Sequence, residues 1–268
     1  MPADHSCFVY DEQAQCRAVA AEFLAEGLRD GQRAAYFGWG DGAELRESFS
    51  SLYGSAGGTA PEAVLVASFD GLYRRDVVPA PDDRLEFWAQ ATEDSLAAGF
   101  SALRAVTETT PWLGLVDQRS TFLRSEVLLD RYMLDHPLSV LCVCDRTRLD
   151  SDAIDDVVCV HPIAEAMSPP FRMYAMPAGS FALNGEIDTF SAPMLERLLA
   201  EVDHTAVGHD LRVDANKLEF VNQQGLRALD CHAARAHLRA VVLRGASAAV
   251  ERLIEMLDLQ HVRSETSR

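Results

Sequence analysis

Lysine, long apolar runs and closely spaced cysteines are all scarce in this sequence of 268 residues. Lysine occurs once, as Lys217, far from any glycine-rich loop. A phosphate loop that hydrolyses nucleotides needs glycines, a lysine for the terminal phosphates and a serine or threonine for magnesium. The single lysine therefore excludes a hydrolase of the Walker type.

Signals for membrane insertion and export are also missing. No run of about 18 apolar residues occurs, so we expect no membrane span. Residues 1–5 lack the basic start and apolar core of a signal peptide. The six cysteines are scattered, without the spacing of a disulfide framework. We therefore expect a cytoplasmic protein in a reducing compartment.

The charge balance is strongly acidic. There are 41 Asp and Glu residues against 24 Lys and Arg residues, which gives a net charge of −17 at pH 7. No basic helix offsets this charge, and an acidic surface repels phosphate backbones, so direct nucleic-acid binding is not expected. In so acidic a chain, Glu108 and Glu126 are expected to be exposed carboxylates rather than a buried pair.

Apolar, β-rich runs alternate with helical patterns over the first 160 residues or so. Predicted strands cover residues 5–10, 33–37, 63–67, 101–106 and 138–144. Predicted helices cover about 12–31, with an apolar face at 16–28, and 42–53, 82–98, 120–134 and 151–160. This alternation indicates an α/β domain with a mostly parallel sheet covered on both faces.

The two halves of the chain are separated by a proline-rich stretch. Pro169 and Pro170 exclude a helix there. We therefore place a linker at residues 168–177, between a first domain at 1–167 and a second at 178–268. A chain of this length can bury two separate cores.

The most specific stretch of the second half lies at residues 211–226. A short apolar strand ends in Asp214, a polar turn follows, and a helix begins at Asn222. Asparagine is a good N-cap because its side-chain oxygen accepts a hydrogen bond from a backbone N–H of the first turn. By shape alone, this is one more strand–turn–helix unit of an α/β domain.

The residues of this stretch resemble the core of STAS domains, the fold of anti-sigma-factor antagonists. There, a strand ending in Asp leads to a helix that opens with Asp-Ser-Ser-Gly. Upstream, the segments Gly-Glu-Ile-Asp at 185–188 and Ser-Ala-Pro at 191–193 resemble the start of the first STAS helix. The resemblance covers about residues 172–262. It implies a mixed sheet flanked by helices.

The resemblance also implies a surface that binds an anti-sigma-factor kinase or another STAS-containing protein. The candidate partner-binding residues are Asp188, Asn222, Gln223, Gln224, Gly225 and Arg227. In the antagonists, a kinase phosphorylates the first Ser of Asp-Ser-Ser-Gly, and Gln223 stands at that position here. Glutamine has no hydroxyl to accept a phosphoryl group, so the added charge that operates this switch is missing. Gln223 is a degenerate phosphoacceptor position.

Several short phrases of the first half occur in a fixed order. They are His5-x-Cys7-x-x-Tyr10, Phe23-Leu24-x-x-Gly27-Leu28, Leu103-Arg104 followed by Glu108 and Trp112, Leu141-Cys142-Val143-Cys144-Asp145, and His161-Pro162. Together they resemble the MEDS domain, the methanogen/methylotroph and dichloromethane-regulator-type sensory domain. The resemblance extends over about 160 residues.

This second resemblance implies a RecA-like α/β sandwich that senses a small organic ligand. The candidate ligand-binding residues are His5, Cys7, Tyr10, Glu108, Trp112, Glu126, Cys142 and Asp145. Two departures affect the expected shape of the pocket. Pro111 adds a residue before Trp112, and Cys144 replaces the aromatic residue that usually precedes the aspartate.

A metal site is an alternative role for part of this set. Cys142 and Cys144 point to one face of a strand, and His5 and Cys7 point to one face of another. If the two strands were neighbours, four soft ligands could converge tetrahedrally. Buried cysteine also packs as a small hydrophobe. We therefore expect core packing, with no metal and no cofactor.

The combined interpretation is a non-enzymatic regulatory protein in which a ligand sensor controls a STAS interaction module. One alternative is a scaffold or oligomerisation protein, including a homodimer, that has no small ligand. The other is an enzyme that acts on a small organic molecule in the first domain. No recognisable nucleophile, metal or cofactor motif supports the enzyme.

Overall fold

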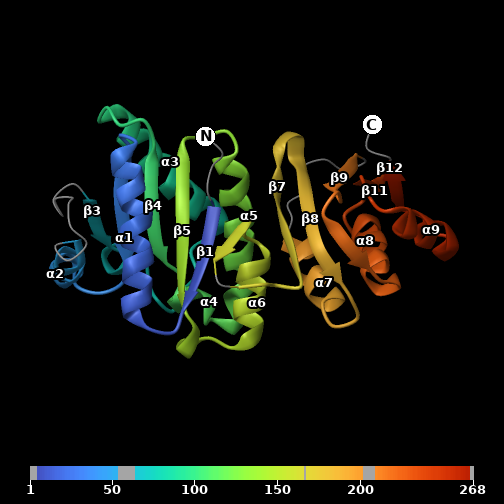
Figure 1. The fold of residues 1–268 in the computed structure, drawn as a ribbon, viewed down its shortest axis with the longest axis horizontal. Coiled ribbons are helices and arrows are strands. Elements are labelled where there is room, and N and C mark those ends of the chain that lie inside the picture. The colour runs from blue at the N-terminus through green and yellow to red at the C-terminus, as the bar shows by residue number, and fades with distance from the viewer. Residues whose placement is uncertain (1–4, 54–63, 166, 202–208, 266–268) are drawn as a thin grey trace. The chain divides into compact units, whose positions relative to one another are not determined.

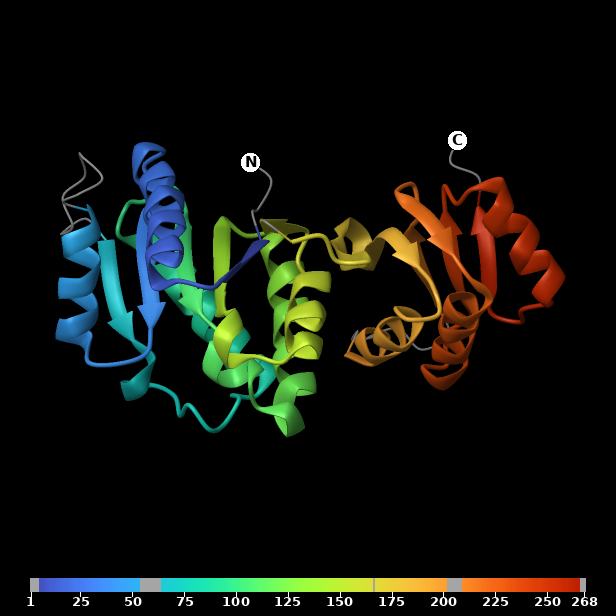
Figure 2. The same cartoon turned by 60° about the horizontal axis from the view of Figure 1, so that its bottom comes forward.

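The computed structural model describes residues 5–53, 64–165, 167–201 and 209–265. The chain divides into two compact units, residues 1–157 with 163–167 and residues 158–162 with 168–268. Each unit combines a β-sheet with helices (Figures 1 and 2), so the predicted α/β class is confirmed for both. Within the described residues, none of the helices combines the length and hydropathy needed to cross a membrane.

A parallel sheet forms the centre of the first unit. Its strands lie in the order β3-β2-β4-β5-β1-β6, and neighbouring strands run parallel throughout, as predicted. The strands are β1 (His5–Tyr10), β2 (Arg33–Gly38), β3 (Val64–Ser68), β4 (Leu103–Glu108), β5 (Leu138–Asp145) and β6 (Ile163–Glu165).

Helices cover both faces of this sheet. They are α1 (Gln13–Arg29), α2 (Gly42–Tyr53), α3 (Pro81–Ala97), α4 (Thr110–Leu113), α5 (Arg119–Met133) and α6 (Ser151–Cys159). Helix α1 lies on one face, and α3 and α5 lie on the other (Figures 1 and 2). The short helix α4 was not predicted. It accommodates Pro111 in its first turn, where the missing N–H costs no helical hydrogen bond.

The central strands are buried, which explains why they appear in the sequence as apolar runs and could be predicted. Every residue of β1 is buried, as expected for a parallel strand covered on both faces. On the α1 face, the core includes Phe8, Leu24 and Leu141. Helix α1 approaches β4 closely at Gly27, because a Cβ atom there would lie 2.6 Å from Cδ of Arg104.

The second unit has a mixed sheet. Its order is β10-β8-β9-β11-β12, with β7 paired to β8 in the only antiparallel pairing among the described strands. The elements are β7 (Phe171–Met176), β8 (Ser180–Ile187), α7 (Ala192–Glu201), β9 (Asp210–Asp214), β10 (Leu218–Val221), α8 (Gln223–Arg235), β11 (Ala240–Arg244), α9 (Ala248–Leu257) and β12 (Val262–Glu265).

Strand β7 lies within residues 168–177, the stretch that was expected to be a linker. Phe171, Met173 and Ala175 are buried, and the residues between them are partly exposed. This alternation is typical of an antiparallel strand with one covered face. The two prolines lie just before the strand and leave its pairing with β8 intact.

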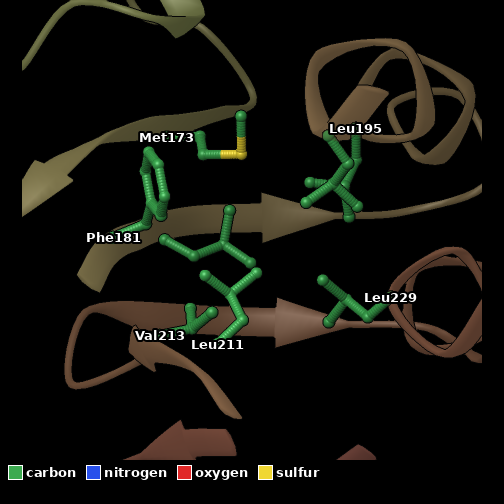
Figure 3. A pocket seen from close by; sticks show the side chains of 8 residues that line it. Met173, Phe181, Leu195, Leu211, Val213 and Leu229 are labelled. Atoms are coloured by element: carbon green, nitrogen blue, oxygen red, sulfur yellow. The ribbon is translucent and has the colours of Figure 1, made fainter. Parts of the chain in front are cut away.

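A small apolar cavity lies in the core of the second unit (Figure 3). Its lining residues are Met173, Phe181, Leu183, Leu195, Leu199, Leu211, Val213 and Leu229. Its volume of about 10 Å³ is about that of a single water site, but a buried water needs polar partners that this lining lacks. The cavity is therefore a dry packing gap rather than a ligand pocket.

Candidate functional site

Five polar side chains meet inside the first unit, and we call them the buried polar cluster. They are His5 from β1, Arg84 from α3, Glu126 and Asp130 from α5, and Cys142 from β5, each with an exposed fraction of 5% or less. Nδ1 of His5 lies 3.1 Å from Oδ1 of Asp130, and Nε2 lies 3.3 Å from Oε2 of Glu126. Cys142 donates from Sγ to the same glutamate oxygen at 3.3 Å.

Helical periodicity and the pairing of two strands together bring these side chains close to one another. Glu126 and Asp130 are four residues apart on α5, so they share one helix face. His5 and Cys142 belong to neighbouring parallel strands, β1 and β5. His5, Glu126 and Cys142 also belong to the one group of His, Cys, Asp and Glu side chains, among the described residues, that is arranged closely enough to hold a metal ion.

Arg84 compensates the charge of Glu126. Its Nη1 donates to Oε1 of Glu126 at 2.9 Å, and its guanidinium lies over the rings of Trp112 and Phe122, at 5.2 and 4.9 Å from their centroids. The expectation that Glu126 is exposed was wrong, because its exposed fraction is 0%. Burial is tolerated because both carboxylate oxygens have charged or polar partners.

The protonation of the cluster follows from these contacts. Burial alone would lower the pKa of His5, but hydrogen bonds to Asp130 and Glu126 outweigh it and raise the pKa to about 9. Burial raises the pKa of the Cys142 thiol well above its usual value. Without a bound cation, the cluster at neutral pH therefore holds a protonated imidazole and a protonated thiol.

Three other candidate sensor residues lie at the carboxyl ends of adjacent strands, the edge where α/β sheets commonly bind ligands. They are Tyr10 on β1, Glu108 on β4 and Asp145 on β5. Burial raises the pKa of Glu108 and of Tyr10, so Glu108 is not the exposed carboxylate that was expected. Asp145 accepts hydrogen bonds from the backbone N–H and the hydroxyl of Thr147, which gives it a capping role.

Trp112 and Cys7 are core residues in this structure. Trp112 is 1% exposed, donates from Nε1 to the backbone oxygen of Arg74 and packs 5.3 Å from the ring of Phe69. Cys7 is equally buried and forms a hydrogen bond with Cys144. The two cysteine-bearing strands are neighbours, which the metal alternative required, but Cys7 and Cys144 do not belong to the metal-compatible group.

A groove of about 270 Å³ lies in the first unit, beside α1. It is lined by Ser6, Val19, Glu22, Phe23, Glu26, Arg104, Leu141 and Ile163. Arg104 donates from Nε to the backbone oxygen of Phe23 and forms an ion pair with Glu26. None of the candidate sensor residues lines this groove. The sequence signal for this groove was Arg104, a charged residue between the apolar residues Leu103 and Ala105 of β4.

The start of α8 in the second unit has the predicted cap. Oδ1 of Asn222 accepts a hydrogen bond from the backbone N–H of Gly225 at 2.9 Å, which confirms Asn222 as the N-cap. Gly225 is buried, and a Cβ atom there would lie 2.6 Å from Cγ2 of Ile187. Gly225 therefore serves the packing of α8 on the sheet.

Other predicted partner-binding residues surround this helix start. Gln223, Gln224 and Arg227 are exposed on the first turns of α8. Nδ2 of Asn222 donates to Oγ1 of Thr189, which joins the loop before α7 to α8, and the neighbouring Phe190 is 90% exposed. We call Thr189, Phe190, Gln223, Gln224 and Arg227 the helix-start surface.

Asp188 directly precedes Thr189 and Phe190 of this surface. It accepts hydrogen bonds from the backbone N–H groups of Phe190 and Ser191, both at 2.9 Å. These bonds, first that from Ser191, lower the pKa of its carboxyl group. Asp188 therefore shapes the loop that presents Phe190.

The comparison with protein families found one match, which covers most of the first unit. The sequence pattern of the MEDS domain, described as the methanogen/methylotroph, DcmR sensory domain, matches residues 4–162. No curated protein matches the chain. The matched range contains the buried polar cluster, the carboxyl-end residues and every residue that lines the groove except Ile163.

Proposed function

Because the chain belongs to the MEDS family of sensory domains, we propose that it is a cytoplasmic regulatory protein whose first unit senses a ligand and controls the second. The second unit acts as a STAS-like interaction module, similar to an anti-sigma-factor antagonist. The observation that carries this proposal is the family match over residues 4–162, combined with the exposed helix-start surface of the second unit. No catalytic step is part of the proposal.

The groove beside α1 is the best-supported position for the ligand. Its volume of about 270 Å³ is close to the lower end of the roughly 300–1,000 Å³ common for small-molecule sites. Its lining combines apolar side chains with the charged groups of Arg104, Glu22 and Glu26. A small organic molecule with one polar end fits this lining.

The helix-start surface supports the proposed interaction module. The exposed phenyl ring of Phe190 offers an apolar anchor, and Gln223, Gln224 and Arg227 offer a polar rim. Buried aromatic anchors surrounded by polar contacts are common at protein interfaces. We propose that this surface binds an anti-sigma-factor kinase. Since Gln223 carries no hydroxyl, binding is regulated by the first unit rather than by phosphorylation.

The proposed regulation is a shift between two arrangements of the protein, of which one leaves the helix-start surface accessible. A ligand shifts such an equilibrium only by its difference in affinity for the two states. The ligand must therefore bind the groove more tightly in one arrangement than in the other.

Affinity capture from the native cytoplasm tests the proposal. The test bait carries Gln223→Asp with Arg227→Glu. The matched control carries Gln260→Asp with Arg252→Glu. It makes the same charge change at exposed positions elsewhere in the second unit. We expect the wild type and the control to retain a histidine-kinase-like anti-sigma factor and the test bait to lose it. Equal retention by both variants would contradict the assigned surface.

A scaffold function is the second candidate, favoured by the exposed ring of Phe190 and by Met256, which is 76% exposed. Exposed apolar side chains of this kind can pair copies of one chain. Sizing chromatography distinguishes the two functions. A ligand-independent oligomer that Phe190→Ser dissociates, together with no captured kinase, would favour the scaffold.

A further inference from the structure

Three members of the buried polar cluster are of the side-chain types that bind transition metals. Zinc in proteins is bound by cysteine sulfur, histidine nitrogen and carboxylate oxygen. From their geometry, we infer that His5, Glu126 and Cys142 bind a zinc ion inside the first unit. This inference does not rest on the proposed function, because a structural or a sensory ion would use the same ligands.

The distances between the ligand atoms agree with a tetrahedral ion. Zinc–ligand bonds of about 2.0–2.3 Å at tetrahedral angles separate neighbouring ligand atoms by about 3.4–3.6 Å. Oε2 of Glu126 lies 3.3 Å both from Nε2 of His5 and from Sγ of Cys142, and Sγ lies 4.0 Å from Nε2. Each separation is within about 0.4 Å of the required value.

Outer contacts hold two of the ligands in the required orientation. Metal-bound histidines usually donate their other ring N–H to a carboxylate or a carbonyl group. Asp130 lies 3.1 Å from Nδ1 of His5 and can fill this role. Arg84 donates to Oε1 of Glu126, which leaves Oε2 facing His5 and Cys142. Asp130 and Arg84 are positioning residues for the ion.

The charges of the cluster also balance with a divalent ion. When Nδ1 of His5 donates to Asp130, its Nε2 presents a lone pair toward the carboxylate of Glu126, so a cation or a proton must lie between them. Zn²⁺ with the Glu126 carboxylate and the Cys142 thiolate is neutral, and the remaining charges of the cluster, one positive on Arg84 and one negative on Asp130, sum to zero. A buried set of charges needs such compensation.

Protons are the competing explanation for the same contacts. One proton on Nε2 of His5 and one on Sγ of Cys142 would satisfy Glu126 through ordinary hydrogen bonds. Zinc would replace both protons, because a metal-bound thiol is deprotonated and a metal-bound imidazole is neutral. A measurement that detects a metal–thiolate bond therefore separates the two descriptions.

The test uses the full chain, purified without a metal-affinity tag. Elemental analysis is expected to find one zinc ion per chain. After chelation, reconstitution with Co²⁺ is expected to produce a thiolate-to-cobalt charge-transfer absorption together with the intense visible bands of a tetrahedral ion. Both signals report on the wild-type protein, so they do not depend on whether a variant folds.

Variants assign the ligands. Cys142→Ala is expected to abolish the charge-transfer band, whereas Cys16→Ala, a matched change at a buried cysteine of α1, is expected to retain it. Asp130→Asn is expected to weaken zinc binding by about 10–100-fold, the usual effect of losing an outer partner of a metal-bound histidine. Wild-type protein that takes up neither zinc nor Co²⁺, or a band that persists in folded Cys142→Ala, would overturn the inference.

Discussion

Replacing Arg84 with methionine is expected to destabilise the first unit strongly. Methionine preserves much of the apolar stem but removes the guanidinium that pairs with Glu126 at 2.9 Å. Both side chains are at most 5% exposed, so the remaining carboxylate would be buried without its cation. Breaking one side of a buried ion pair costs about 3–5 kcal/mol.

Urea denaturation followed by tryptophan fluorescence measures this loss. The three tryptophans, Trp39, Trp88 and Trp112, all lie in the first unit, so the signal reports on that unit. With a slope of about 2 kcal/mol per molar urea, the predicted loss lowers the midpoint by about 1.5–2.5 M. The measurement is made with excess chelator, so that metal binding does not contribute.

Arg74→Met is the matched control. It breaks an ion pair with Asp76 at 2.6 Å, but these side chains are 74% and 66% exposed. Solvent screens such a pair, so the midpoint is expected to stay unchanged. If Arg84→Met lowered the midpoint no more than Arg74→Met, the assignment of Arg84 as the compensating charge of the cluster would be wrong.

Three further results follow from the structure. Gly225→Ala is expected to lower the free energy of unfolding of the second unit by about 1–3 kcal/mol, because the added methyl group overpacks against Ile187. Circular dichroism during denaturation measures the change, and an unchanged free energy of unfolding would contradict the close packing. Asn222→Ala is expected to cost about 1 kcal/mol in the same assay through loss of the N-cap, and Asn222→Ser should restore most of it. Burial raises the pKa of Glu108 in the folded state above its ordinary value of 4.5. Just above pH 4.5 the folded state therefore binds more protons at this group than the unfolded state does. As a result, the contribution of Glu108 makes the free energy of unfolding fall as pH rises from 4.5. Fluorescence-monitored denaturation across this pH range measures the effect. The free energy of unfolding of the wild type should fall relative to that of Glu108→Gln as pH rises. A difference that stays constant with pH would show that Glu108 titrates normally.

Local features of the chain were predictable from the sequence because neighbouring residues determine them. Residues 138–144 are apolar except for Ser139, as expected when both faces of a parallel strand are covered, and the structure places β5 there. The cap at Asn222 depends only on the three residues that follow it. Strand β7 shows the limit, because its alternating pattern was masked by the preceding prolines.

The buried polar cluster was not predictable in the same way. Glu126 is buried because Arg84, 42 positions earlier, and His5, on another strand, approach it in the folded state. Composition alone favoured an exposed carboxylate in so acidic a chain. Similarly, the sequence did not predict the groove, because Arg104 becomes part of the groove lining only when α1 packs beside β4. Such sites depend on contacts between residues far apart in the sequence.

Phosphate transfer to the start of α8 tests the central proposal most directly. The captured kinase, incubated with ATP, is expected to leave the wild type unmodified because Gln223 has no hydroxyl. It should add one phosphate to Gln223→Ser but none to Gln224→Ser, a matched change at the neighbouring exposed position. Mass spectrometry detects the modification. Phosphate on the wild-type protein, or none on a folded Gln223→Ser variant, would contradict the claim that this surface is an antagonist-like site with a degenerate phosphoacceptor.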